Sequence, residues 1–289
     1  MINKLCIIGV GLIGGSLARA LKEKGYCKHI VGSSRRAEHL QKAVDLGVID
    51  SYSIDMQEAA KDADVIIVCV PLGAMEVVFS KIKDVINPDT IITDVGSSKQ
   101  SVVDAAEKAF GEIPANLIPG HPIAGTEKSG VEASFAELFQ CRKIIITPLE
   151  NNDPQQVEKI EQMWLQTGAE VRQMSVQHHD EVLAATSHLP HVLAFGIVDT
   201  LAKMDSQQEI FEYAAGGFRD FTRIASSDPV MWRDICVNNR DALLKVMRKY
   251  IEDMELMYDL IEKSDGEAIK DMFEGAKGIR DRFNEMLNA

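Results

Sequence analysis

An α/β fold with a doubly wound parallel sheet, followed by an all-α half, is the fold class that the sequence predicts. Up to about residue 174, short apolar runs rich in Ile and Val alternate with helical patterns. Strands of this kind, buried on both faces and separated by helices, are typical of parallel sheets. From residue 175 onward, long helical periodicity replaces the strand-like runs. We therefore expect an α/β domain at 1–174 and a helical domain at 175–289, with a packed junction because no low-complexity linker separates them.

The expected elements follow in order along the chain. The runs that we expect to form strands are Leu5–Ile8, Ile30–Gly32, Val65–Val70, Ile91–Asp94, Leu117–Gly120 and Lys143–Thr147. The helical patterns that accompany them include Gly14–Lys24, Ala37–Asp45 and Pro154–Thr167, with Ala169–Gln173 as one more candidate strand. In the second half, helical periodicity covers His179–Met204 and Asp228–Lys263 and continues to Ala289.

The composition of the chain limits the kinds of molecule that it is expected to bind. The chain has 289 residues, 46% of them hydrophobic, and a formal net charge of −13. That charge disfavours nucleic-acid binding. We find no signal-like N-terminus and no apolar stretch that looks long enough to span a bilayer, so we expect a cytoplasmic protein with no membrane or nucleic-acid partner. Five scattered cysteines, without a C-x-x-C pair, favour buried thiols over disulfides or a metal site, and we expect no metal.

A glycine pattern lies where the first expected strand turns into a helix. In Gly9-x-Gly11-x-x-Gly14, the first glycine permits a tight turn and the second lets the backbone approach a pyrophosphate. The third allows close packing of the helix on the strand, and the helix N-terminus faces the phosphates. Because the strand and the helix flank the pattern, it predicts a Rossmann-like dinucleotide site, with Leu12 and Ile13 in the same turn. A glycine turn without a ligand is the minority alternative.

The end of the second expected strand bears on cofactor choice. An NAD site usually carries an acid about 20 residues after the glycines, to bind the ribose 2′-hydroxyl. This chain instead has Ser33-Ser34-Arg35-Arg36. Hydroxyl and guanidinium groups suit a 2′-phosphate, which favours NADP slightly and makes Ser33 and Arg35 cofactor candidates. The alternative, in which Arg35 and Arg36 are solvated and the enzyme accepts either cofactor, has nearly the same weight as the preference for NADP.

Several polar segments end expected strands and should meet near the nicotinamide. Ligands of open parallel sheets bind beyond the carboxyl ends of the strands. Val70 and Pro71 end one strand, Ser97 follows the next, and His121 ends the one after. Taken alone, His121 could be a buried histidine with only a structural role. Because it is expected to lie beside the cofactor, a catalytic role is the better hypothesis.

The helical half supplies further candidates. Ser187 and His191 are four residues apart and share a face if a kinked helix accommodates Pro190. Arg219 and Arg223 are also four apart and suit bidentate binding of carboxylates, although surface ion pairs are the usual fate of arginine in an acidic protein. Trp232 is expected to be a core residue.

Taken together, these motifs resemble the prephenate/arogenate (cyclohexadienyl) dehydrogenase family of tyrosine biosynthesis. The resemblance covers nearly the whole chain in the right order. The segments that carry it are Gly9–Ser16, Asp94–Lys99, His121–Gly130, Ser187–His191 and Gly217–Ala225. It implies a Rossmann domain, a helical dimerisation domain with a homodimer, and NAD(P)-dependent oxidative decarboxylation of prephenate or arogenate.

The resemblance also implies roles for single residues. His121 matches the catalytic histidine that accepts a hydrogen bond from the ring hydroxyl, and Ser97 matches the serine beside that hydroxyl and the nicotinamide. Arg223 matches the arginine that holds a substrate carboxylate. Ser187 and His191 match substrate-pocket residues, and Glu127 and Lys99 match residues near that pocket, with Glu127 as a further candidate for substrate binding. Members that use NAD commonly have an aspartate at the second strand, and this sequence departs from them there.

Two rival functions remain. Another dehydrogenase of similar layout, of the β-hydroxyacid or imine reductase type, lacks the His-Pro-Ile-Ala-Gly-Thr-Glu segment that begins at His121. A non-catalytic NADP-sensing protein would have no need of His121. No residue in the sequence decides between prephenate and arogenate.

Overall fold

The structure, a computed structural model, describes residues 1–126, 128–204 and 207–288. The chain divides into two compact units, Met1–Arg240 and Asp241–Ala289. The first unit contains all the strands of the described residues together with the helices up to residue 238. The predicted domain boundary after residue 174 falls inside this unit, between its last strand and the helix that follows, and stays a prediction.

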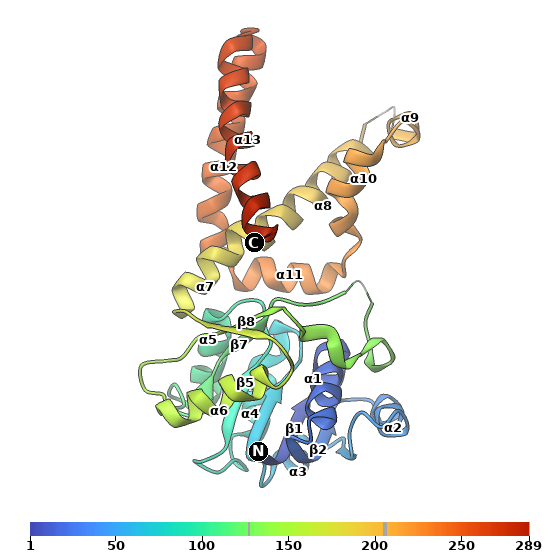
Figure 1. Ribbon diagram of the computed structural model, residues 1–289, viewed down its shortest axis with the longest axis vertical. Helices are drawn as coiled ribbons and strands as arrows, with labels where there is room; N and C mark the ends of the chain where they lie inside the picture. The colour runs from blue at the N-terminus through green and yellow to red at the C-terminus, as the bar shows by residue number, and fades with distance from the viewer. Residues whose placement is uncertain (127, 205–206, 289) are drawn as a thin grey trace. The chain divides into compact units, whose positions relative to one another are not determined.

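A six-stranded parallel sheet is the centre of the first unit (Figure 1). Its strands lie in the order β3-β2-β1-β4-β5-β6, which is the order of a doubly wound dinucleotide-binding sheet. The strands are β1 Ile2–Ile8, β2 Cys27–Ser33, β3 Ser51–Ser53, β4 Val65–Val68, β5 Ile91–Asp94 and β6 Leu117–Ile118. The predicted α/β class is confirmed. The sequence analysis missed β3, because Ser-Tyr-Ser offers no apolar run.

Alternate residues of the strands build two cores, one on each face of the sheet. In β1, Leu5 and Ile7 belong to one cluster, whereas Cys6 and Ile8 belong to the other. This alternation follows from the two-residue period of a strand. The first cluster is covered by α1 Leu12–Glu23, α2 Ala37–Asp45 and α6 Pro154–Leu165, and the second by α3 Met56–Ala60, α4 Met75–Ile82 and α5 Gln100–Phe110.

A second, three-stranded sheet corrects one sequence expectation. The run expected as a single strand at Leu117–Gly120 divides at Pro119, which has no N–H to donate to a ladder. The chain then forms β7 Gly120–Pro122, antiparallel to β8 Lys143–Ile146, which is parallel to β9 Glu170–Gln173. His121 therefore lies inside a strand of this smaller sheet, opposite Ile145, and not at the carboxyl end of a strand of the main sheet.

The predicted helix over His179–Met204 forms as a continuous run with one irregular turn. Its parts are α7 Val176–Leu183, the π-helical turn η4 Ala184–His188 and α8 Leu189–Ala202. The N–H of Leu189 bonds to the carbonyl of Ala184, and Pro190 follows in the first turn of α8. The π turn thus absorbs the proline, whose missing N–H and ring disfavour a regular helix.

This same run corrects an expectation about membrane-spanning length. Over Val176–Ala202, 27 residues, it is apolar enough by length and composition to cross a bilayer, with a mean hydropathy of 1.3. One such helix is weak evidence of a membrane span, because helices of soluble proteins pass the same test. Its buried side chains include His179, Asp180 and His188. Charged and polar groups of this kind are costly in lipid.

The rest of the first unit is helical. Its elements are α9 Gln207–Glu212, α10 Gly216–Thr222, the 3₁₀ turn η5 Arg223–Ser226 and α11 Pro229–Asn238. Asp228 caps α11 by accepting a hydrogen bond from the N–H of Met231, and Pro229 stands at the first turn. The run expected to continue from Asp228 to Lys263 breaks at Asn239, whose backbone leaves the helical region.

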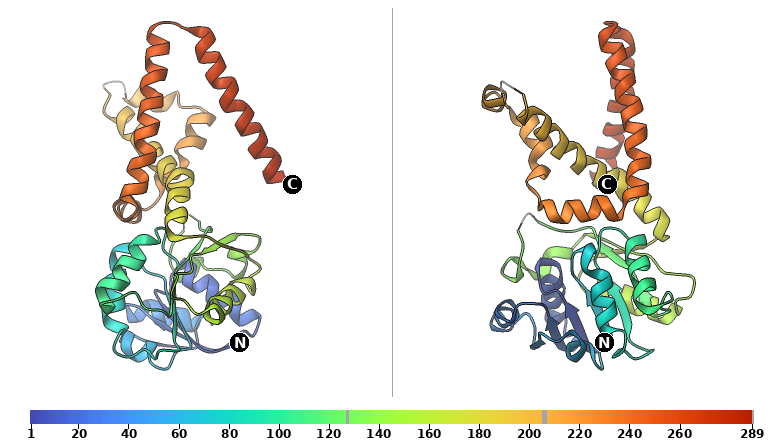
Figure 2. Two further views of the ribbon diagram at one scale, coloured as in Figure 1. Left: turned by 90° about the vertical axis from the view of Figure 1, so that its left-hand side faces the viewer. Right: turned by 180° about the vertical axis from the view of Figure 1, so that it is seen from behind.

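The second unit consists of two long helices that diverge from a tight turn (Figure 2). α12 Arg240–Glu262 and α13 Gly266–Asn288 are joined by a turn in which Ser264 has a φ of 54°. Many large apolar side chains of both helices are exposed. They include Leu244, Ile251, Met254, Leu256, Tyr258, Ile261, Phe273, Ile279 and Phe283.

We expect Gly9→Ala to lower the free energy of unfolding by about 1–3 kcal/mol or more and to abolish nucleotide binding. Gly9 has a φ of 100°, and an added Cβ would collide with the carbonyl oxygen of Cys69. Gly25→Ala is the matched control, since Gly25 has a φ of 59° but no atom within 4 Å of an added Cβ. Urea denaturation compares the two variants. An equal loss in both would show that collision with Cys69 is unimportant.

Candidate active site

The loop between β1 and α1 has the shape of a phosphate site. Gly11 is the N-cap of α1, which has no side-chain cap and no acidic residue in its first turn. Nothing lies within 4 Å of a Cβ built on Gly11, whereas one built on Gly14 would lie 2.7 Å from the carbonyl oxygen of Gly9. Exposed N–H groups at a helix N-terminus suit a pyrophosphate. Leu12 and Ile13 are partly buried and pack on the core beneath the loop.

The cofactor candidates at the end of β2 differ in their exposure to solvent. Ser33 is fully buried, and its hydroxyl has no hydrogen-bond partner among the described residues. Arg35 and Arg36 are exposed in the turn that precedes α2. A bound 2′-phosphate would therefore meet the guanidinium groups more readily than the Ser33 hydroxyl. The cofactor role of Ser33 and Arg35 stays a prediction.

The carboxyl ends of β4 and β5 carry the next candidates. Val70 is partly buried, and the exposed Pro71 caps the 3₁₀ turn η1 Leu72–Ala74. Ser97 is partly buried and follows Gly96, whose N–H donates to Asp94 at 2.6 Å. These segments leave neighbouring strands of one parallel sheet at the same edge, where ligands of such folds bind.

A fully buried ion pair fixes β7 against β5. The Nζ of Lys99 lies 2.5 Å from Asp94 Oδ2 and donates to the carbonyl of Gly120 at 2.6 Å. Asp94 Oδ1 accepts from the N–H of Gly120 at 3.1 Å. Burial lowers the pKa of Lys99, and Asp94 opposes this effect. The pair therefore anchors the backbone directly before His121.

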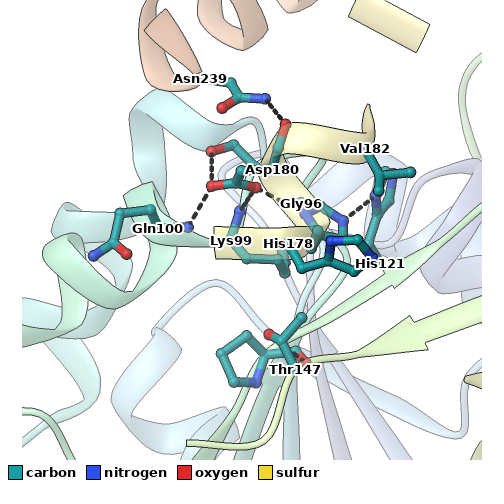
Figure 3. Close-up of polar contacts among 12 residues, drawn as sticks. Gly96, Lys99, Gln100, His121, Thr147, His178, Asp180, Val182 and Asn239 are labelled. Atoms are coloured by element: carbon teal, nitrogen blue, oxygen red, sulfur yellow. Dashed lines mark hydrogen bonds and ion pairs between the residues drawn. The ribbon is translucent and has the colours of Figure 1, made fainter. Parts of the chain in front are cut away.

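His121 is the first member of a buried chain of three side chains (Figure 3). Its Nδ1 lies 2.9 Å from His179 Nε2, and His179 Nδ1 lies 2.7 Å from Asp180 Oδ1. No described residue hydrogen-bonds to His121 Nε2, and this atom is not fully enclosed. Burial lowers the pKa of His121 well below 6.5, and His179, Lys99 and His188 lower it further. A neutral imidazole with one free nitrogen is what a general base requires.

Asp180 joins this chain to the start of α5. Its carboxylate accepts hydrogen bonds from the backbone N–H groups of Lys99 and Gln100, at 2.7 and 2.9 Å, and from the hydroxyl of Ser98 at 3.3 Å (Figure 3). Burial alone would raise the pKa of Asp180, but hydrogen bonds from His179 and from these backbone groups lower it. The carboxylate is thus held ionised.

The π turn and the start of α8 carry two further histidines, His188 and His191. His188 is buried, its Nδ1 accepts from the side-chain amide of Asn239 at 3.0 Å, and burial lowers its pKa to about 4. His191 donates from Nδ1 to the carbonyl of Ser187 at 2.9 Å and stacks on Trp232, with ring centroids 3.5 Å apart. Trp232 is buried in the second core cluster, so its predicted core position is confirmed.

The arginines lie apart from the buried histidines. Arg219 and Arg223 are both exposed. Burial lowers the pKa of His191, and the charge of Arg223 lowers it further, which places that guanidinium within electrostatic range of His191. No contact joins Arg219 to a site histidine among the described residues. Glu127 lies outside the described residues.

The sequence analysis missed His179 and Asp180. A His-Asp pair in the first turn of the helical half was the available signal, but nothing local connects it with His121, which is 58 residues away from His179. Within the described parts of the chain, no group of three or more His, Cys, Asp or Glu residues has the arrangement of a metal site. The cluster is therefore a hydrogen-bonded network.

Comparison with known proteins agrees with this geometry. The family model for the nucleotide-binding domain of prephenate dehydrogenase matches residues 17–173, and the model for its dimerization domain matches residues 175–275. The chain belongs to the prephenate dehydrogenase family. It is thus a nicotinamide-dependent oxidoreductase and not the non-catalytic NADP-sensing protein that was the alternative.

Individual relatives cover nearly the whole chain. The cyclohexadienyl dehydrogenase of Zymomonas mobilis subsp. mobilis is 38% identical over 96% of this chain and 94% of its own. The prephenate dehydrogenase of Bacillus subtilis is 36% identical over 97% of this chain and 76% of its own. The crystal structure of Aquifex aeolicus prephenate dehydrogenase, in complex with hydroxyphenyl propionate and NAD+, has a TM-score of 0.91 and 34% identity over 98% of this chain and 99% of that one.

We expect Lys99→Met to lower the free energy of unfolding by about 3–5 kcal/mol, because it leaves the buried carboxylate of Asp94 without its counter-charge. Lys108→Met is the control, since Lys108 and Glu76 form an exposed pair at 3.7 Å. Exposed pairs contribute little, so this variant should be as stable as the parent. Urea denaturation measures both, and a wild-type midpoint for Lys99→Met would contradict the anchoring role of the pair.

Proposed function

We propose that this enzyme converts prephenate to 4-hydroxyphenylpyruvate by oxidative decarboxylation, the step that leads to tyrosine. The observation that carries the proposal is the buried His121, whose Nδ1 is engaged and whose Nε2 has no hydrogen-bond partner among the described residues. Arogenate, which would give tyrosine directly, is the second candidate. It is favoured by the likeness to the arogenate dehydrogenase of Synechocystis, with a TM-score of 0.83 and 26% identity over 97% of this chain and 99% of that one.

The residues of the β1–α1 loop fit a dinucleotide. Gly9, Gly11 and Gly14 would hold its pyrophosphate, with Val70 and Pro71 along its path toward the site. When bound, its nicotinamide ring supplies the acceptor for the hydride from ring carbon C4. We propose that NAD+ and NADP+ are both accepted, with NADP+ favoured by Arg35 and Arg36. The NAD+ in the Aquifex aeolicus complex supports the broader acceptance.

His121 acts on the C4 hydroxyl of the substrate. Its Nε2 accepts the hydroxyl proton as C4 is oxidised, and returns it to the oxygen when loss of the ring carboxylate as CO₂ makes the ring aromatic. Aromatisation drives the reaction, so the protein mainly orients the substrate and supplies one hydrogen-bond acceptor. Ser97 lies beside the reacting hydroxyl in this scheme.

The helical half binds the rest of the substrate. Arg223 holds a carboxylate of the substrate, and Ser187 and His191 line the same pocket. The stacking of His191 on Trp232 fixes the imidazole in place for this role. Arg219 and Glu127 are further candidates for substrate binding. Guanidinium groups suit carboxylates because they donate two parallel hydrogen bonds.

We propose a cytoplasmic homodimer. The matched dimerization model over residues 175–275 and the exposed apolar side chains of α12 and α13 support the dimer. A groove on α12, lined by Tyr250, Met254 and Tyr258 among others, is part of that apolar surface. Sedimentation velocity at several protein concentrations tests the dimer.

The function is tested by assaying the purified protein with prephenate and arogenate, each crossed with NAD+ and NADP+, while the absorbance of the reduced nicotinamide is followed. We expect turnover with prephenate, and His121→Asn should lower kcat by about 10²–10⁴-fold with little change in KM. No turnover with any of the four pairs would refute the proposal. An active His121→Asn variant would remove His121 from the mechanism.

We expect kcat to stay level as pH falls through 6.5 and to decrease only at more acid pH. The base must be neutral, and burial together with nearby positive charge lowers the pKa of His121 well below 6.5. Protonation, and with it the loss of activity, therefore begins below the range of an ordinary histidine. An acid limb centred at 6.5 or higher in the pH profile of kcat would contradict this prediction.

A further inference from the structure

Three buried side chains from two elements form a hydrogen-bonded chain that ends at the reactive imidazole of His121. His121 is on β7, and His179 and Asp180 are consecutive residues of α7. The two histidine rings meet edge to face, with centroids 5.1 Å apart. His179 is fully buried and hydrogen-bonds through both of its ring nitrogens. Each ring nitrogen of His179 is thus committed to a single partner (Figure 3).

The proton positions follow from the end of this line. An ionised carboxylate can only accept, so the Nδ1 of His179 carries the proton that faces Asp180. Burial lowers the pKa of His179, which keeps the ring neutral and leaves its Nε2 as an acceptor. His121 must then donate from Nδ1. Its Nε2 is left with a free lone pair.

We propose that Asp180 and His179 form a positioning relay that holds His121 in the tautomer whose Nε2 accepts a proton. This inference rests on the role of His121 in the proposed function. His179 and Asp180 do not touch the reacting atoms, and no proton has to travel along the relay. The hydrogen bond from His121 Nδ1 to His179 also stabilises the imidazolium that forms once Nε2 has accepted the hydroxyl proton.

Asp180 has a structural task that does not need His179. It caps the start of α5 through the N–H groups of Lys99 and Gln100. A histidine buried between that carboxylate and His121 adds nothing to the cap, and its burial is costly unless both ring nitrogens are satisfied. The structural task therefore accounts for Asp180 but leaves His179 unexplained.

The charges around His121 make such a relay useful. Burial lowers the pKa of His121 most, and the charges of His179, of Lys99 before α5 and of His188 in η4 lower it further. Asp94, at the end of β5, is paired with Lys99. The carboxylate of Asp180 acts on His121 through His179, where it favours the protonated form of that ring. The relay thus offsets part of the positive field when His121 receives its proton.

The tautomer is measured directly by ¹⁵N NMR of histidine-labelled protein at neutral pH, without substrate. The resonances of His121 are identified by their loss in His121→Asn. We expect Nδ1 protonated and Nε2 unprotonated, the reverse of the form that a free neutral histidine favours. Protonation at Nε2 in the wild-type protein would overturn the relay.

Variants add a kinetic readout. His179→Phe keeps a ring but removes the acceptor, and we expect kcat to fall by about 10²–10³-fold with KM changed less than about twofold. His179→Gln, which retains a donor and an acceptor, should recover part of this loss. His178→Phe is the matched control, because His178 is the exposed neighbour. Unchanged kcat in folded His179→Phe would overturn the proposal.

The outcomes separate this inference from the proposed function. An active wild-type enzyme with the wrong His121 tautomer would overturn the relay alone. A wild-type protein inactive with every substrate and cofactor pair would overturn the function, while the NMR spectrum would still decide the tautomer. If His179→Phe does not fold, the wild-type spectrum alone decides.

Discussion

The buried carboxylate of Asp180 connects the helical segment of the first unit to the sheet that holds the base. Its Oδ1 accepts from the N–H of Lys99 and from His179, and its Oδ2 accepts from the N–H of Gln100. Backbone N–H groups at a helix N-terminus carry a partial positive charge, so the carboxylate remains ionised although it is out of water. Together with the hydrogen bond from Asn239 to the carbonyl of Asp180, this interaction helps to hold α7, and with it His179, against His121.

A second buried carboxylate fixes the strand that carries His121. Asp94 binds Lys99 and also accepts from the N–H groups of Gly96 and Gly120. Removing one charge of such a pair is expensive because the other stays buried without compensation. Burial lowers the pKa of His121 most, and the ammonium that anchors β7 lowers it further, so the contact that positions the base also helps to keep it neutral.

Local patterns in the sequence were enough for most of the fold. Apolar runs and the glycine loop predicted the parallel sheet, because strands buried on both faces and a strand–turn–helix junction have local signatures. They did not predict β7, because Pro119 ends one strand and the next pairs with a segment about two dozen residues further on. Antiparallel pairing at that distance depends on tertiary packing.

The site was predictable only in part, for the same reason. His121 was identified by its segment, but the groups that set its tautomer come from α7, on the other side of a contact that spans 58 residues. Arg223 was identified by its segment as well, and the structure places its charge near His191. The hydroxyl of Ser33 proved to be enclosed, because β2 lies between β3 and β1 in the sheet and its last residue is still buried.

The overall charge of the chain makes short-range contacts decisive for the proposed substrate. A net charge of −13 does not attract a dianion, but at physiological ionic strength exposed charges are screened beyond about 8 Å. Binding must therefore depend on cations within a few ångströms of the site. Lys99 is already neutralised by Asp94, so in the proposed function the exposed arginines, Arg223 above all, are the candidates for binding carboxylates. Arg219 and Arg223 lie on α10 and η5, outside the buried network, so a substrate bound to them as proposed would leave the hydrogen bonds that hold His121 undisturbed.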